Sequence, residues 1–120
     1  MLVCQRPDIV GKMLVKRKFS DLQCGLFTNN HTPGLMDVLD YYEISDNQIV
    51  ALSGPKWEID VTPRGWYAEH PEVTFSGQSQ AFGYAIFRGK TLLWSERFTF
   101  ECVKEIFGWT LDLTPTIKMD

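Results

Sequence analysis

Residues 82–98 constrain the fold of this chain more than any other part of the sequence. They read FGYAIFRGKTLLWSERF, which is two apolar runs separated by Gly89, a residue that can take the positive φ of a tight turn. Both runs alternate with a period of two, and in the second run this period places Leu92 and Trp94 on one face. The pattern predicts a β-hairpin with a buried face.

Further short alternating segments, separated by turn residues, extend over the rest of the chain. They lie near residues 22–27, 48–52, 57–62, 73–75 and 109–117. Roughly seven or eight short strands of this kind are typical of a sandwich or barrel, and 120 residues suit one domain. We therefore expect an all-β, mainly antiparallel sandwich or barrel-like fold, in which Pro115 lies at an edge or breaks the last strand.

The N-terminal 19 residues follow a different pattern from the rest of the chain. Apolar residues recur at helical spacing after a proline that can begin a helix, and basic residues follow them. We expect residues 1–19 to form a short helix or an extended arm, and residues 20–120 to form a single β domain. Because such an arm can reach beyond its own domain, its residues are candidate contacts to a partner protein. These candidates are Pro7, Ile9, Val10, Met13, Leu14, Lys16 and Arg17.

The charge and the apolar pattern of the chain argue against several classes of partner. Twelve basic and 15 acidic residues give a formal net charge of −3, so the basic field that holds nucleic acid is missing. The apolar runs are too short to span a membrane, and no signal peptide is predicted. Three irregularly spaced cysteines predict neither a disulfide framework nor a zinc site. We expect no nucleic-acid partner, no membrane partner, and synthesis in a reducing cytoplasm.

The polar residues do not form a recognisable catalytic pattern. His31 and His70 both adjoin turn residues, where a solvated side chain is commoner than a general base. Asp37, Asp40 and Glu43 would share one face of a helix and could hold a hard cation, but a solvated face is the better interpretation. The sequence also lacks a Gly-rich phosphate loop. We therefore expect no enzyme activity, no cofactor and no small-molecule substrate.

Four residues of the β domain are further candidates for protein contact. Glu96 and Arg97 are charged residues on opposite faces of an otherwise apolar strand. They either deter edge-to-edge pairing, contact a neighbour across an interface, or form a cross-strand salt bridge. Trp66 and Tyr67 follow a turn, and an exposed aromatic pair anchors a protein more commonly than another ligand. The tryptophans within the alternating strands are expected in the core.

Short motifs follow one another along nearly the whole chain. After an N-terminal stretch from proline to glycine at 7–11, they are CGLFTNNHTP at 24–33, ALSGPKWEI at 51–59, PEVTF at 71–75, FGY at 82–84, LLWSERF at 92–98 and LTPTI at 113–117. In their order and spacing these motifs resemble a widespread family of small bacteriophage structural proteins that are encoded among virion genes. Phe82 stands where the family pattern has tyrosine, Ser95 stands where it has alanine, and residues 99–108 are more apolar than the pattern.

This resemblance implies a virion component of the kind that decorates or cements the phage head. Such proteins are small β-rich domains that sit on the assembled capsid, often as trimers at local three-fold axes. The expected partners are the major capsid protein and further copies of this chain in a homotrimer. The expected location is the capsid surface of the virion, after synthesis in the host cytoplasm. The alternative is a tail or receptor-binding component that binds glycan through Trp66 and Tyr67.

Overall fold

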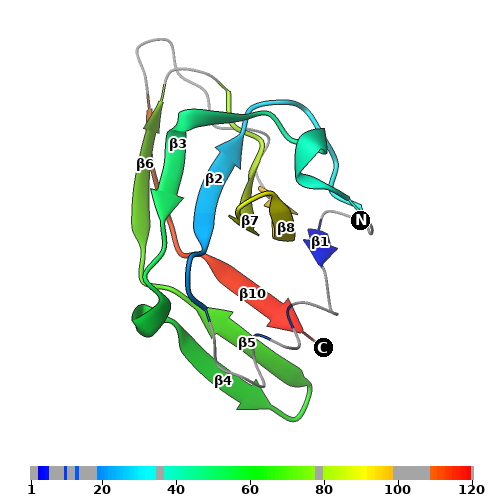
Figure 1. Ribbon diagram of the computed structural model, residues 1–120, viewed down its shortest axis with the longest axis vertical. Helices are drawn as coiled ribbons and strands as arrows, with labels where there is room; N and C mark the ends of the chain where they lie inside the picture. The colour runs from blue at the N-terminus through cyan, green and yellow to red at the C-terminus, as the bar shows by residue number, and fades with distance from the viewer. Residues whose placement is uncertain are drawn as a thin grey trace.

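A five-stranded antiparallel sheet forms one layer of the protein (Figure 1). In spatial order its strands are β1 (Val3–Gln5), β8 (Thr91–Arg97), β7 (Gly83–Arg88), β2 (Gln23–Phe27) and β3 (Ile44–Ala51). The predicted hairpin, β7 and β8, lies inside this sheet, and Gly89 in its turn has a φ of 60°. The structure is a computed structural model, and it describes residues 3–5, 10, 13, 19–34, 37–77, 80–98 and 109–119.

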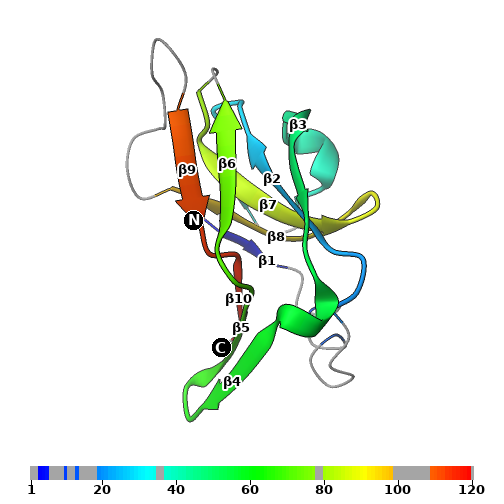
Figure 2. The ribbon, with the colours of Figure 1, turned by 90° about the vertical axis from the view of Figure 1, so that its left-hand side faces the viewer.

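The second layer is a long, bent β-ribbon. Its strands are β4 (Glu58–Thr62), β5 (Gly65–Glu69) and β10 (Thr116–Met119) in one part, and β6 (Val73–Gly77) and β9 (Trp109–Leu113) in the other. Figure 2 shows β6 continuing β5, and β10 continuing β9, along the side of the five-stranded sheet. At the bend the backbone N–H of His70 donates to the carbonyl of Pro115 at 2.9 Å. Pro115 breaks the last strand, which confirms one of the two predicted alternatives.

The main core fills the space between the sheet and the ribbon. Leu26, Ile86 and Trp94 come from the sheet, and Phe75 and Ile117 come from the ribbon. All five are at most 4 % exposed, so each contributes about 1.5–3 kcal/mol by burial. This packing of two antiparallel layers confirms the predicted all-β fold and gives it the form of a β-sandwich.

A β-bulge in the hairpin changes the faces that its side chains occupy. Ile86 is opposite Trp94 but Phe87 is opposite Leu92, so Leu93 is an extra residue in β8. Leu92 therefore packs with Phe87 in a smaller core cluster on the outer face of the sheet, while Trp94 packs in the main core. The prediction that Leu92 and Trp94 share a face is wrong, because the bulge interrupts the period of two.

The described residues of the N-terminal segment belong to the same packed unit. β1 pairs with β8, where Val3 is opposite Glu96. Val10 and Met13 have helical backbone conformation and are 0 % and 4 % exposed in the main core. Phe19 stacks on Trp57, with 5.2 Å between the ring centroids. These residues thus stabilise the β domain from inside.

Three segments of the chain form elements that the sequence pattern left open or did not indicate. In the ambiguous segment 35–44, the 3₁₀ helix η1 (Leu39–Tyr41) precedes β3, which begins at Ile44 rather than near residue 48. Strand β5 was not among the predicted strands. A second 3₁₀ helix, η2 (Gly54–Lys56), leads into β4.

Within the described ranges, no helix has the length and apolarity that a membrane span requires.

Candidate functional site

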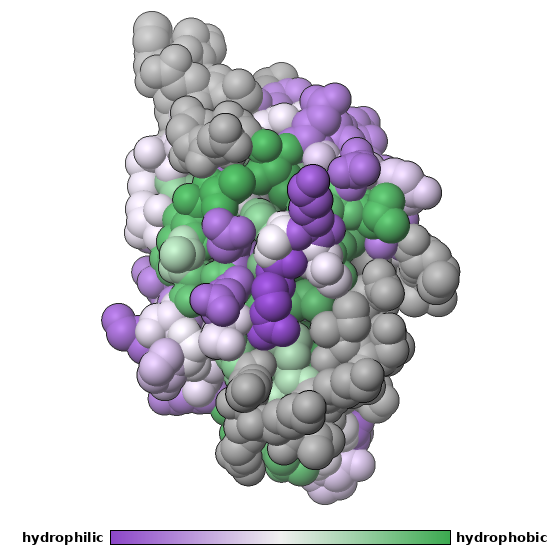
Figure 3. All heavy atoms as spheres, viewed as in Figure 1, coloured by the Kyte–Doolittle hydropathy of each residue, from purple (hydrophilic) through white to green (hydrophobic). Residues whose placement is uncertain are grey.

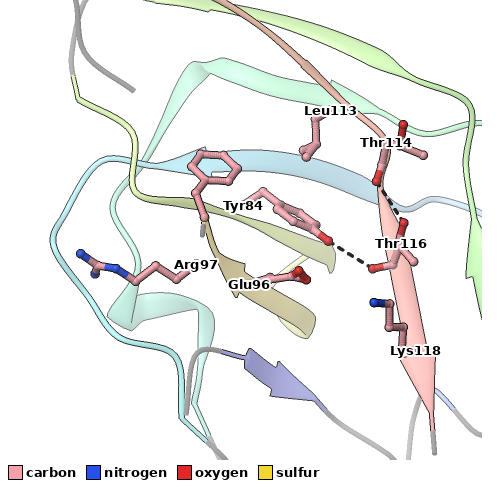
Figure 4. A pocket seen from close by; sticks show the side chains of 8 residues that line it. Tyr84, Glu96, Arg97, Leu113, Thr114, Thr116 and Lys118 are labelled. Carbon is pink, nitrogen blue, oxygen red and sulfur yellow. Dashed lines mark hydrogen bonds between the residues drawn. The ribbon is translucent and has the colours of Figure 1, made fainter. Parts of the chain in front are cut away.

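An open cleft of about 230 Å³ lies between β8 and β10, where the two layers meet. Figure 3 shows a row of hydrophilic residues near the centre of this view, with hydrophobic residues on both sides. Strands β8 and β10 lie in this part of the molecule in Figure 1. Figure 4 shows Tyr84 and Glu96 on the side of the sheet and Thr116 and Lys118 on β10. The lining residues are Tyr84, Glu96, Arg97, Phe98, Leu113, Thr114, Thr116 and Lys118.

Tyr84 connects the two layers at the base of the cleft. Its side chain is 4 % exposed, and its hydroxyl donates to the carbonyl of Thr116 at 3.3 Å. Its ring stacks on that of Phe98 with 6.4 Å between centroids. Burial raises the pKa of the Tyr84 hydroxyl, and the nearby charge of Glu96 raises it further. The phenol therefore keeps its proton and serves as a hydrogen-bond donor.

Glu96 is a half-buried carboxyl at the end of the core-facing row of β8. It is opposite Tyr84 on β7, and it follows Trp94 on the same face. Burial raises the pKa of Glu96, and the positive charge of Lys118 and a hydrogen bond from Tyr84 offset this only in part. The charged form of Glu96 is thus incompletely compensated within the protein.

Arg97 lies at the rim of the cleft, and its side chain extends away from Tyr84 and Glu96 (Figure 4). Its Nη1 donates to the carbonyl of His31 at 3.1 Å, and its guanidinium lies 5.2 Å from the centroid of the Phe82 ring. The prediction that Glu96 and Arg97 lie on opposite faces is therefore confirmed. Arg97 anchors the loop that contains His31 to the end of β8.

A chain of polar side chains lies behind the cleft, on the outer face of the sheet. Asp37 Oδ2 accepts hydrogen bonds from Tyr42 Oη at 2.6 Å, His31 Nε2 at 2.9 Å and the backbone N–H of Gly34 at 3.0 Å. Because the proton of Tyr42 is used there, the hydroxyl of Ser95 donates to Tyr42 at 2.6 Å. Burial alone would raise the pKa of Asp37, but these hydrogen bonds outweigh it and the pKa is lowered.

This polar chain is suited to holding the fold rather than to catalysis. Ser95 is 0 % exposed, and Tyr42 and Asp37 lie between it and His31, so the histidine is not placed to activate the serine. The chain instead ties the connection between β2 and β3 to strand β8. Ser95 is an integral member of this polar chain. Its sequence signal was a polar residue between the apolar residues 92–94 and the charged residues 96–97.

The predicted acidic face around η1 does not form as one face. The side chain of Asp37 is buried and accepts hydrogen bonds from neighbouring residues of the domain, whereas Asp40 and Glu43 are exposed. The 3₁₀ helix is too short to bring all three carboxylates together. Across the described part of the chain, no three His, Cys, Asp or Glu residues gather in a way that could hold a metal ion.

His70 is buried, so the prediction of a solvated histidine is wrong for this residue. It is 5 % exposed at the bend of the ribbon. Its Nε2 accepts from the backbone N–H of Ser53 at 3.0 Å, and its Nδ1 donates to the carbonyl of Pro71 at 2.8 Å. Its ring lies edge-on to Trp57 at 5.5 Å. Both ring nitrogens are used in structural contacts.

The candidate residues Trp66 and Tyr67 are consecutive in β5. By register Tyr67 shares the outer face with Asp60, and Trp66 is opposite Val61. The side chain of Trp66 lies outside the described residues. Tyr67 is half-buried, and its neighbour Asp60 raises its pKa.

The predicted contact residues of the N-terminal segment divide into two groups. Val10 and Met13 are core residues, so in this conformation they are not available to a partner. The remaining five lie outside the described residues and are Pro7, Ile9, Leu14, Lys16 and Arg17.

Comparisons of the chain with protein-family models, with curated proteins and with solved structures found no match.

Proposed function

We propose that this protein is a non-enzymatic structural component of a bacteriophage virion, which binds the assembled shell of the major capsid protein and stabilises it. The observation that carries the proposal is the ordered motif series, whose residues supply strands of both layers. A family of structural proteins would keep such residues because they define the domain that is presented to the shell. Self-association as a homotrimer is part of the same proposal.

The internal use of the polar residues supports a structural role. Ser95, Tyr42 and Asp37 bond to one another inside the domain, and both nitrogens of His70 contact the backbone. Groups that satisfy one another in this way rigidify a domain. A small protein that holds neighbouring capsomers together requires such rigidity.

Exposed apolar side chains at two separate places support a bridging role. Val38 and Tyr41 are 44 % and 53 % exposed in and beside η1, and Val61 is 73 % exposed on β4. Figure 1 shows η1 and β4 at distant parts of the molecule. Two separated apolar contact points suit a protein that contacts two neighbours at once.

A sedimentation experiment tests the proposal directly. The full-length protein is mixed with shells assembled from the major capsid protein, and we expect it to co-sediment with a saturable stoichiometry. The double variant Val38→Ser/Tyr41→Ser and the single variant Val61→Ser change only exposed side chains, and each should reduce binding. Glu72→Gln, which is also exposed, serves as the control. Failure of the unaltered protein to bind any shell would contradict the proposal.

Labelling of intact virions separates the two locations that the resemblance leaves open. Antibody against this chain should label heads if the protein decorates the capsid. Label confined to tails would contradict the proposed location and favour the tail or receptor-binding alternative.

A further inference from the structure

We propose that the cleft between β8 and β10 binds one arginine side chain of another protein, with the guanidinium against the Glu96 carboxylate. The stem of that arginine would lie along the apolar wall that Leu113 and Phe98 provide. This inference concerns the ligand of the cleft itself, and it holds whichever assembly the protein joins.

The size of the cleft selects a side chain rather than a free small molecule. Its volume is about 230 Å³, whereas pockets for drug-sized ligands span roughly 300–1,000 Å³. The cleft is also open to solvent, so a side chain that extends from a docked surface can enter it. A long, unbranched side chain with a polar end matches an apolar wall that leads to a carboxylate.

The chemistry of the cleft favours a cation at its inner end. Glu96 is half-buried and has lost part of its hydration, while the hydroxyl of Tyr84, which contacts it, also donates to the Thr116 carbonyl. A group with several N–H donors would restore the hydrogen bonds of the carboxylate. The guanidinium is better suited than an ammonium, because it is planar, weakly hydrated and able to donate two parallel hydrogen bonds.

Aromatic rings beside the carboxylate add a second attraction for a guanidinium. Tyr84 and Phe98 line the cleft as a stacked pair with an interplanar angle of 29°, and the face of an aromatic ring attracts cations. The protein already contains one contact of this kind. On the opposite face of the sheet, Arg97 lies over the ring of Phe82 and donates to a carbonyl oxygen.

Lys118 provides a test of whether the cleft binds a cationic or an anionic side chain. It is exposed on β10 and its positive charge acts on Glu96, so an incoming arginine competes with it. Removing this charge should therefore strengthen arginine binding. If the cleft instead accepted an anionic side chain, Lys118 would be its main attraction and the same change would weaken binding.

The test is a titration of the full-length protein with N-acetyl-arginine amide, followed by ¹⁵N–¹H NMR spectra. We expect saturable shifts at the amides of Tyr84, Glu96 and Thr116. Glu96→Gln should weaken binding by roughly tenfold, as for the loss of a charge-assisted hydrogen bond, and Lys118→Gln should strengthen it. The control variant Glu69→Gln changes an exposed carboxylate outside the cleft and should leave binding unchanged.

Two outcomes would overturn the proposal. One is the absence of shifts at the cleft amides in the unaltered protein. The other is tighter binding of N-acetyl-aspartate amide than of the arginine probe, with weaker aspartate binding in Lys118→Gln. Because Lys118 is exposed, this variant remains informative even if Glu96→Gln fails to fold. Shell binding is measured separately, so failure here and failure of the proposed function are distinguishable.

Discussion

The hydroxyl of Ser95 in β8 lies 2.6 Å from that of Tyr42, a residue 53 positions earlier in the chain. This contact joins the central sheet to the connection between β2 and β3, and it leaves Tyr42 able to donate its own proton to Asp37. The two hydroxyls are therefore not equivalent, because that of Tyr42 bonds to both Asp37 and Ser95, whereas that of Ser95 bonds to Tyr42.

The first prediction compares removal of these two hydroxyls. Ser95→Ala leaves the bond between Tyr42 and Asp37 in place, so we expect a loss of about 0.5–1.5 kcal/mol in the free energy of unfolding. Tyr42→Phe leaves two buried partners with fewer bonds and should cost about 1–3 kcal/mol. Urea denaturation of the two variants measures the difference. A larger loss of unfolding free energy for Ser95→Ala than for Tyr42→Phe would contradict the proposed series of hydrogen bonds from Ser95 to Tyr42 to Asp37.

The second prediction concerns Asp37 and acid. Hydrogen bonds hold the pKa of Asp37 below its ordinary value, which is about 3.9 in an unfolded chain. Between the folded and the unfolded pKa of Asp37, the unfolded state binds more protons than the folded state. The stabilisation that the Asp37 carboxylate provides is therefore present above about pH 4 and is lost as the pH falls through the folded pKa. The stability difference between the unaltered protein and Asp37→Asn should therefore shrink in acid. Unfolding curves between pH 3 and pH 7, roughly spanning this window, provide the measurement.

Glu96 should show the opposite dependence on pH. Its pKa is raised by burial, so just above its ordinary value of about 4.3 the folded state binds more protons than the unfolded state. Stability should fall as the pH rises through the folded pKa, because the buried carboxyl must then ionise. Glu96→Gln removes this cost, and at neutral pH it should be at least as stable as the unaltered protein. A clear loss of stability at pH 7 would contradict this prediction.

Gly83 should not tolerate even a methyl group. A Cβ atom there would collide with the carbonyl of Glu96 and with the ring of Phe27, and both are fixed in the sheet and its outer core. We expect Gly83→Ala to destabilise the protein by about 1–3 kcal/mol or more. Gly34→Ala is the matched control, because its Cβ would meet only ordinary contacts. Thermal unfolding of both variants compares them, and equal midpoints would refute the predicted collision.

Local patterns of the sequence were sufficient for the hairpin, the turn at Gly89 and most strands, because alternation depends on near neighbours. The bulge at Leu93 was not predictable, since it follows from how the hairpin packs on both faces. His70 is expected in a loop from its neighbours in the sequence, but the bend of the ribbon and the contacts with Trp57 and Ser53 bury it.

The candidate site was predictable only in part, because its members meet through the fold. Glu96 stood out as a charge in an apolar strand, but Tyr84 and Lys118 reach it from other strands. The partners of Asp37 and Ser95 were likewise out of reach of any local pattern, because the link between Tyr42 and Ser95 spans the sheet.

The bend at His70 and Pro115 has a mechanical consequence. Few residues separate β5 from β6, or β9 from β10. The ribbon therefore follows the 43 Å long axis of the molecule without a flexible linker at its bend. Tension applied at the tip of β4 and β5 would pass along paired main chains, whose hydrogen bonds share it in shear. The hydrogen bond from His70 to Pro115 acts at the corner as a brace, so the molecule should stretch little before it unfolds.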